Sequence, residues 1–182
     1  MSHTTIIALV DEAYGLEPYH KIISGVGKIN ATFAACVAAN TGVKKIFNYG
    51  SAGAVRDKSL IGKLVKVQYC IQRDMNTVPL TPRGDTPFET DYNSTLTLDA
   101  DSGITLGTGD SFVTHADPWF EQMNIDCVDM EAYAIAKVCK RLNLEFECYK
   151  YITDAADEDA QTNWSDNLHK GAALFEEVLK NV

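Results

Sequence analysis

Short apolar runs alternate along the chain with segments whose apolar residues recur at helical spacing. The strand-like runs are residues 5–10, 45–49, 64–71, 104–107, 127–128 and 146–152. The helical pattern occupies residues 28–40, 131–142 and 168–182. Strands that alternate with helices usually lie parallel in one sheet, and the connecting helices cover both of its faces. The sequence therefore predicts an α/β fold, a three-layer sandwich with a mixed, mainly parallel central sheet, in a single domain spanning residues 1–182.

The composition fits a globular protein and argues against several classes of partner. The 182 residues are 46% hydrophobic and carry a formal net charge of −9. Because an acidic surface repels nucleic acid and anionic lipid, neither is expected as a partner. No window has the apolar length of a membrane span, and residues 1–15 lack the basic start of a signal peptide. We therefore expect a cytoplasmic protein that binds neither nucleic acid nor membrane.

The cysteines and histidines show no metal-binding pattern. The five cysteines are widely spread and contain no C-x-x-C pair, and the four histidines lack ligand spacing. Such cysteines are typical of reduced thiols in an intracellular protein. No metal site is expected.

Three acidic residues are placed where strands end or a helix begins. Glu12 follows the run at residues 5–10, Asp154 follows the run at 146–152, and Glu131 opens a helical segment. Sites in parallel α/β sheets lie beyond the carboxyl ends of the strands, so these acids are expected near one edge. Several carboxyl groups in one cleft suit glycosidic chemistry, in which one protonates the leaving group and others handle water and the sugar.

Two glycine-containing motifs have structural as well as functional interpretations. Gly25-Val26-Gly27 matches part of a dinucleotide-binding fingerprint, but Asn30 stands at the third glycine position. A tight turn is therefore favoured over an NAD-dependent oxidoreductase. Residues 50–53 (GSAG) end a predicted strand, and they indicate either a plain turn or a close approach of the backbone to a ligand.

The acidic motifs also have structural alternatives. Asp129 and Glu131 could cap the helix that follows them, and Thr153 or Asp154 could be the N-cap of another helix. Residues 72–102 contain three prolines and many Thr and Asp residues, and they indicate a long functional loop.

Four segments, taken in order, resemble one known family. They are NYGSAGAV at 48–55, GTGDSFV at 107–113, CVDMEAYAIAKVC at 127–139 and YITDAADED at 151–159. They resemble the methylthioadenosine/S-adenosylhomocysteine nucleosidases of the nucleoside phosphorylase superfamily. The resemblance covers most of the chain, which is shorter than typical members. It implies a purine nucleoside as the substrate.

The resemblance implies catalytic roles for three acids. Asp154 matches the general acid that protonates purine N7, and Glu131 matches the carboxylate that binds the ribose hydroxyls. Glu12 matches the residue that orients or deprotonates the attacking water. The implied substrate-binding residues are Ser51, Ala52, Gly53, Phe112, Val113, Asp129, Met130, Lys150 and Thr153. Phe112 would stack on the base and the Val113 backbone would read its edge. Lys150 stands where the family usually has arginine, and Asp129 is shorter than the usual acid.

The choice of nucleophile depends on the arginines. Phosphorylases of this superfamily hold phosphate with arginines, one of them just before the glycine-serine loop, where this chain has Asn48. No arginine occurs before Arg56. Without guanidinium donors a phosphate dianion would be poorly held, so water is the expected nucleophile and no cofactor is required. A phosphate-dependent phosphorylase and a catalytically idle nucleoside-binding module are the alternatives.

The long loop at residues 72–102 indicates that two copies of the chain associate. In the family, the equivalent region shapes the pocket for the 5′-substituent, often with help from a second subunit. A loop of this length needs a partner to order it. We therefore expect a homodimer.

Overall fold

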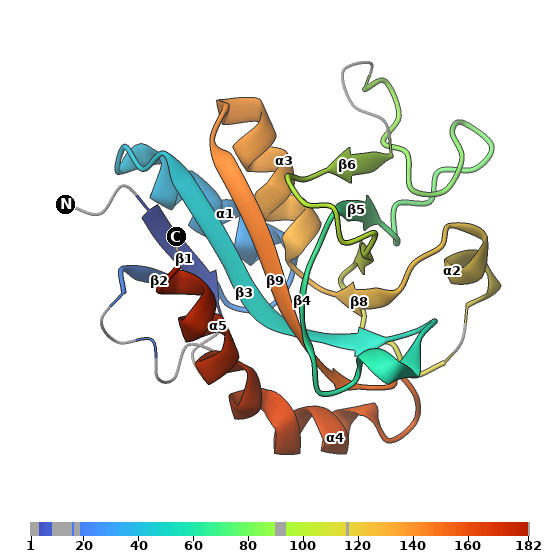
Figure 1. Ribbon diagram of the computed structural model, residues 1–182. Helices are drawn as coiled ribbons and strands as arrows, with labels where there is room; N and C mark the ends of the chain where they lie inside the picture. The colour runs from blue at the N-terminus through green and yellow to red at the C-terminus, as the bar shows by residue number, and fades with distance from the viewer. Residues whose placement is uncertain (1–3, 9–15, 17–18, 90–93, 116, 182) are drawn as a thin grey trace.

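The computed structural model describes residues 4–8, 16, 19–89, 94–115 and 117–181 (Figure 1). Its strands are β1 (Thr4–Ala8), β2 (Lys21–Ile23), β3 (Lys45–Ala54), β4 (Leu64–Lys66), β5 (Tyr69–Gln72), β6 (Thr95–Thr97), β7 (Thr105–Thr108), β8 (Cys127–Asp129) and β9 (Glu145–Asp154). Its helices are α1 (Lys28–Asn40), α2 (Pro118–Gln122), α3 (Ala132–Leu142), α4 (Ala160–Asn167) and α5 (Ala172–Leu179), with 3-10 turns η1 (Lys58–Leu60) and η2 (Leu168–Gly171). None of these helices has the length and apolar character needed to cross a bilayer.

All the described strands belong to one sheet. Its main path runs β2-β1-β3-β8-β7-β5-β6, and β9 pairs with both β3 and β4. Five of the eight strand pairings are parallel and three are antiparallel. The longest pair is β3 with β9, two ten-residue strands that run side by side through the middle of the molecule (Figure 1). This confirms the prediction of a mixed, mainly parallel sheet.

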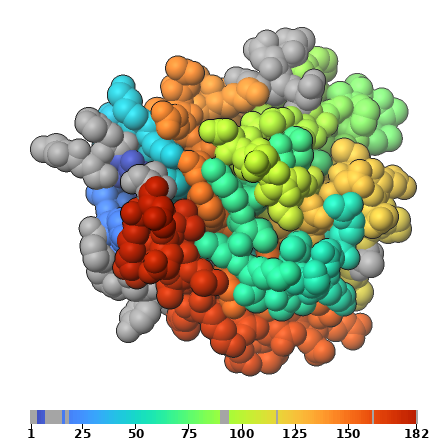
Figure 2. All heavy atoms as spheres, in the orientation of Figure 1, coloured from blue at the N-terminus to red at the C-terminus, as the bar shows by residue number. Residues whose placement is uncertain are grey.

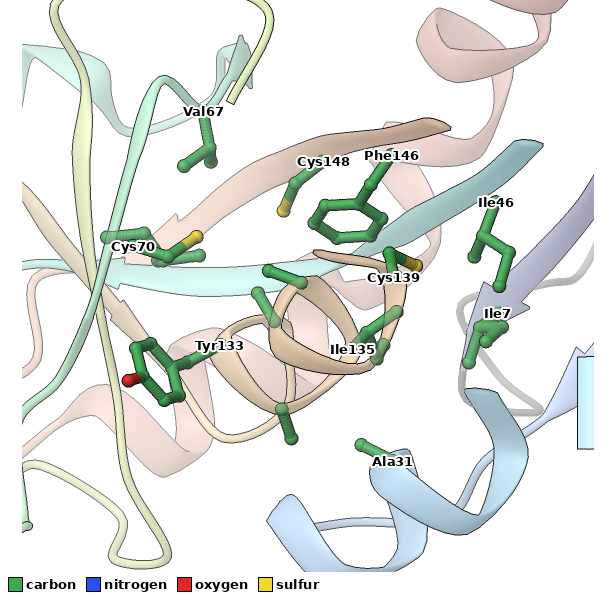
Figure 3. Packing of buried hydrophobic residues seen from close by; sticks show 14 of the residues in the cluster. Ile7, Ala31, Ile46, Val67, Cys70, Tyr133, Ile135, Cys139, Phe146 and Cys148 are labelled. Atoms are coloured by element: carbon green, nitrogen blue, oxygen red, sulfur yellow. The ribbon is translucent and has the colours of Figure 1, made fainter. Parts of the chain in front are cut away.

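Side chains alternate between the two faces of the long strands, as the pleat of a strand requires. On one face, Ile46 and Cys148 pack against α1 and α3 (Figure 3). On the other face, Phe47 and Tyr49 pack against Phe175 of α5. Helices therefore cover both faces of the sheet, which confirms the three-layer arrangement. Figure 2 shows the C-terminal helices, in red and orange, lying along one side of the molecule.

Helices α1 and α3 bury different kinds of side chain. The buried residues of α1 are all alanines, which let its backbone approach the core closely. Its larger apolar residues Ile29, Phe33 and Val37 are exposed. In α3, by contrast, apolar side chains such as Ile135 and Cys139 face the core, and polar residues face solvent. The α1 helix therefore presents an apolar surface that no described part of the chain covers.

The glycine-rich segment 50–53 does not end its strand. β3 continues through Ala54, with Gly50 and Ser51 paired to β9 and Gly53 paired to β8. Small residues suit this stretch because it is enclosed by neighbouring strands. The register between β3 and β9 shifts between Ala52 and Gly53, which brings Gly53 opposite Asp154. The predicted end of the strand at residue 49 was therefore wrong, and so was the plain-turn alternative for residues 50–53.

Other boundaries also differ from the prediction. The run at 64–71 forms two strands, β4 and β5, which pair with different neighbours. The segment 72–102 contains β6, and the predicted C-terminal helix begins as the separate turn η2. Helices α2 and α4 were not predicted. Thr153 and Asp154 end β9 and do not cap a helix, so that alternative was wrong.

Candidate active site

A cavity of about 580 Å³ opens where the ends of β7, β8 and β9 meet the last residues of β3. Nine residues singled out from the sequence line it: Ser51, Ala52, Gly53, Phe112, Val113, Asp129, Met130, Glu131 and Asp154. The cavity volume lies within the range of small-molecule sites. Segments far apart in the sequence thus form a single pocket.

Asp154 is a buried carboxyl group at the end of β9. Its Oδ2 accepts a hydrogen bond from the Thr153 hydroxyl at 2.7 Å, and its Oδ1 accepts one from the Ala156 N–H at 2.8 Å. It forms no ion pair with any described residue. A side chain at Gly53 would place its Cβ 2.7 Å from Oδ1, so only glycine leaves room for this carboxyl group. Asp154 is therefore oriented by neutral donors while facing the cavity.

Glu131 lies on another wall of the same cavity, immediately before α3. Its Oε1 accepts a hydrogen bond from the Gly27 N–H at 3.0 Å, at the amino end of α1. The positive end of a helix dipole favours an anion at this place. Gly27 has φ 94°, a conformation that favours glycine. The Gly25–Gly27 motif thus forms a bend that leads into α1, with both glycines at positive φ, and it orients a carboxylate of the site.

Asp129 and Lys150 form an ion pair beside the cavity. Lys150 Nζ lies 2.9 Å from Asp129 Oδ2, and both side chains are 1% exposed. The Asp129 carboxylate also accepts hydrogen bonds from the Thr108 hydroxyl and from the backbone N–H groups of Glu131 and Ala132. Asp129 therefore caps α3, as its structural alternative predicted. Lys150 and Asp129, two of the positions that depart from the family pattern, therefore contact each other.

Lys150 and Thr153, which were predicted to bind substrate, do not line the cavity. Lys150 contacts Asp129 and Thr153 contacts Asp154, so each supports a residue that does. Glu12, the third predicted acid, lies outside the described residues. The supporting roles of Lys150 and Thr153 could not be predicted from composition or spacing. The partner of Lys150 lies on another strand, and the contact between Thr153 and Asp154 depends on how their side chains are oriented.

Several cavity residues were not predicted. They are Val26, Arg73, Ser111, Thr114 and Trp164, with Val128 and Ala156. Trp164 of α4 donates its indole N–H to the Ser51 hydroxyl at 2.8 Å. The only sequence feature that could have indicated Trp164 is that it is an aromatic residue in the otherwise polar segment 160–167. Arg73 had no such signal.

Cysteines near the site belong to the core. Burial raises the pKa of Cys148 to about 12, and burial also raises the pKa values of Cys70 and Cys127. These thiols are therefore neutral at pH 7 and are not poised as nucleophiles. Among the residues that the structure describes, no group of three or more His, Cys, Asp or Glu side chains could hold a metal ion.

Comparisons with known proteins agree with this architecture. The sequence profile of the Phosphorylase superfamily matches residues 14–182, so the chain belongs to this superfamily. A 5′-methylthioadenosine/S-adenosylhomocysteine nucleosidase from Bacillus cereus is 26% identical, covering 94% of this chain and 84% of the relative. The corresponding nucleosidase from Oceanobacillus iheyensis is 24% identical, covering 88% and 79%.

Solved structures share the fold at lower identity. A Helicobacter pylori MTAN-D198N mutant with 5′-methylthioadenosine in its active site has a TM-score of 0.88, 18% identity and full coverage of both chains. A futalosine hydrolase mutant from Helicobacter pylori also has a TM-score of 0.88, with 17% identity and full coverage of both chains. These likenesses show that the chain shares the fold of these proteins over its full length.

Proposed function

We propose that this protein hydrolyses the N-glycosidic bond of a purine nucleoside of the methylthioadenosine or S-adenosylhomocysteine class. The observation that carries the proposal is the position of Asp154 and Glu131 on the walls of one cavity. Glu131 is oriented by the distant Gly27 N–H, and Asp154 is oriented by the N–H of Ala156, two residues further along the chain. The nucleosidases among its relatives support the same assignment.

In the proposed reaction Asp154 donates a proton to N7 of the purine. The bond between the base and C1′ of the sugar then breaks, and its electron pair leaves with the base as a neutral molecule. The sugar develops oxocarbenium character, which a carboxylate near the ribose stabilises. Glu131 accepts hydrogen bonds from the ribose hydroxyls in this step. Water adds to C1′ and passes its extra proton to a carboxylate. That Glu12 orients this water or accepts the proton stays a prediction.

The arginines support water over phosphate as the nucleophile. Arg73 is the one arginine that lines the cavity in the described part of the chain. Its Nη1 donates to the Ser111 hydroxyl, and its Nη2 donates to the carbonyl oxygens of Gly109 and Ser111. Because these donors are directed to the protein, Arg73 is poorly placed to hold a phosphate dianion.

We also propose that the protein is a homodimer in the cytoplasm. The exposed apolar side chains of α1, Ile29, Phe33 and Val37, would be covered by a second copy. The loop after β5 adds Leu80 and Phe88, of which Phe88 is 94% exposed. Free cysteine thiols support a reducing compartment. A monomeric mass in solution at micromolar concentration would contradict the dimer.

The test is release of free base from a panel of nucleosides, with and without phosphate, measured by chromatography. The panel holds methylthioadenosine, S-adenosylhomocysteine, adenosine, deoxyadenosine and futalosine, and an Asp154→Asn sample reports contaminating activity. Release that is independent of phosphate supports the proposal, and the ranking identifies the 5′-substituent. Release that requires phosphate would indicate a phosphorylase. Saturable binding without release would indicate an idle nucleoside-binding module.

A further inference from the structure

Arg73 is a buried cation beside the cavity that the proposed reaction does not use. It directly follows β5, and its side chain is enclosed so that the residue is 4% exposed. Its backbone N–H donates to the Thr108 carbonyl at the end of β7. The side chain therefore starts next to the point where the chain leaves β7 and enters the segment 109–113.

The guanidinium group binds the first half of that segment. Nη2 donates to the Gly109 carbonyl at 3.0 Å and to the Ser111 carbonyl, and Nη1 donates to the Ser111 hydroxyl at 3.0 Å. Hydrogen bonds from a charged donor are stronger than neutral ones. Three such bonds from one rigid, planar group fix the course of the backbone between Gly109 and Ser111.

The absence of a side chain at Gly109 makes room for the guanidinium group of Arg73. A Cβ atom at residue 109 would lie 2.9 Å from Arg73 Cζ and 2.9 Å from Asp74 Cγ. Any larger residue there would force the guanidinium group away from the loop. The glycine and the arginine therefore act as a pair.

Direct binding of a ligand by Arg73 fits the geometry less well. Its Nε has no hydrogen-bond partner among the described residues, but this atom is itself buried. Burial lowers the pKa of Arg73, and Asp74, Asp110 and Asp129 oppose that shift. A cation in this setting is held by the protein and not by an occupant of the cavity.

We propose that Arg73 is a positioning residue that fixes the segment 109–111 so that Phe112 and Val113 present the binding surface for the purine base. This inference rests on the proposed function, because it assigns the base to Phe112 and Val113. Asp154 and Glu131 lie on β9 and before α3, outside this segment. Loss of Arg73 should therefore weaken binding of the base more than it slows bond cleavage.

The test compares Arg73→Met and Arg73→Lys with the unchanged protein. Steady-state kinetics give kcat and KM for the preferred nucleoside, and calorimetry gives the affinity for the free base. For Arg73→Met we expect KM to rise about tenfold and base affinity to fall about tenfold, with kcat changed by less than about threefold. Arg73→Lys should recover part of the loss, because an ammonium group replaces some of the bonds.

Arg56→Lys is the matched control. Arg56 also makes three guanidinium hydrogen bonds, to Asp126 and Asn124, but it does not line the cavity. Its variant should leave KM and base affinity unchanged. Gly109→Ala should reproduce the effect of Arg73→Met from the other side of the contact.

Two results would overturn the proposal. One is base affinity and KM within twofold of the unchanged protein in both Arg73 variants. The other is a fall in kcat with KM unchanged, which would place Arg73 in the chemistry. If Arg73→Met does not fold, Arg73→Lys and Gly109→Ala decide between these results. Base affinity is measured without turnover. If the protein without substitutions binds the base but cleaves no nucleoside, the proposed function is refuted, and the affinities of the Arg73 variants still test the role of Arg73.

Discussion

The two ends of the β3–β9 pair hold carboxyl groups in opposite settings. Near the start of β9, Glu147 accepts from Lys66 Nζ at 2.9 Å, from the Tyr149 hydroxyl at 2.7 Å and from Lys45. Burial alone would raise the pKa of Glu147, but these bonds outweigh it and lower the pKa to about 2. At the other end, Asp154 receives one hydroxyl and one backbone N–H and faces a cavity. Both strands run side by side between these ends (Figure 1).

The difference shows that surroundings, and not residue type, decide what a carboxyl group can do. A carboxylate bound by two lysines is held as an anion and stabilises the fold. A carboxyl group held by neutral donors, next to a cavity, has the surroundings in which we propose a general acid. One pair of strands thus carries a structural anion at one end and a proposed acid at the other.

The largest expected effect comes from removing the proposed acid. Asp154→Asn keeps the shape of the side chain and its contact with the Thr153 hydroxyl, but it cannot supply the proton. We expect kcat for base release to fall about a thousandfold, with binding of the free base retained. Asp157→Asn, three residues further on and with a side chain that is 45% exposed, is the control and should keep nearly full activity. Normal turnover by Asp154→Asn would refute the assignment.

A substitution in the middle of β9 tests whether a change between its two ends affects both stability and activity. Lys150→Met leaves Asp129 buried without its ion-pair partner. We expect the free energy of unfolding to fall by about 3 kcal/mol, as for other broken buried pairs, and activity to fall because Asp129 caps the helix beside Glu131. Urea unfolding measures the first effect. The double variant Lys150→Met, Asp129→Asn should recover part of the stability, and no recovery would show that the pair is not the cause.

The structural end of the pair should respond to pH. Because the pKa of Glu147 is about 2 in the folded protein and 4.5 in its unperturbed state, its contribution to stability is present above pH 4.5 and is lost as the pH falls through 2. Glu147→Gln should lower the free energy of unfolding by about 1 kcal/mol at pH 7, and the difference should shrink at pH 3. Glu145→Gln, on an exposed residue of the same strand, is the control. If Glu147→Gln slowed base release as well as lowering the free energy of unfolding, the two ends of the strand pair would not have separate roles.

The smallest effect should come from the hydroxyl that orients the acid. Thr153→Val preserves shape and removes the donor to Asp154 Oδ2. We expect kcat to fall about fivefold, the worth of one hydrogen bond, with stability nearly unchanged. Thr153→Ser keeps the hydroxyl and should keep the activity. Equal losses in both variants would point to packing as the cause.

The sequence predicted the layers of the fold better than the ends of its elements. The α3 helix was predicted because apolar side chains such as Ile135 and Cys139 recur on one face. The extension of β3 through Gly50–Gly53 was missed, because glycine and alanine normally end strands, and only the enclosing strands β8 and β9 keep this segment extended. The α4 helix has a polar sequence and gave no periodic signal.

The candidate site shows the same division. Asp154 and Glu131 were singled out because their motifs are distinctive, with Asp154 after a predicted strand and Glu131 at the start of a predicted helix. Arg73 was not predicted as a site residue, because nothing in the neighbouring sequence shows that its guanidinium group contacts Gly109 and Ser111. The partnership between Lys150 and Asp129 likewise depends on two strands meeting in space.

Two of the contacts that build the cavity join residues about a hundred positions apart. The Gly27–Glu131 hydrogen bond spans 104 residues, and the Trp164–Ser51 bond spans 113. Contacts of such sequence separation form slowly, because most of the chain must be ordered before they close. During refolding, or during synthesis on the ribosome, the site cannot exist before the C-terminal quarter of the chain has joined the sheet. Recovery of activity would therefore mark the end of folding, later than the appearance of helices.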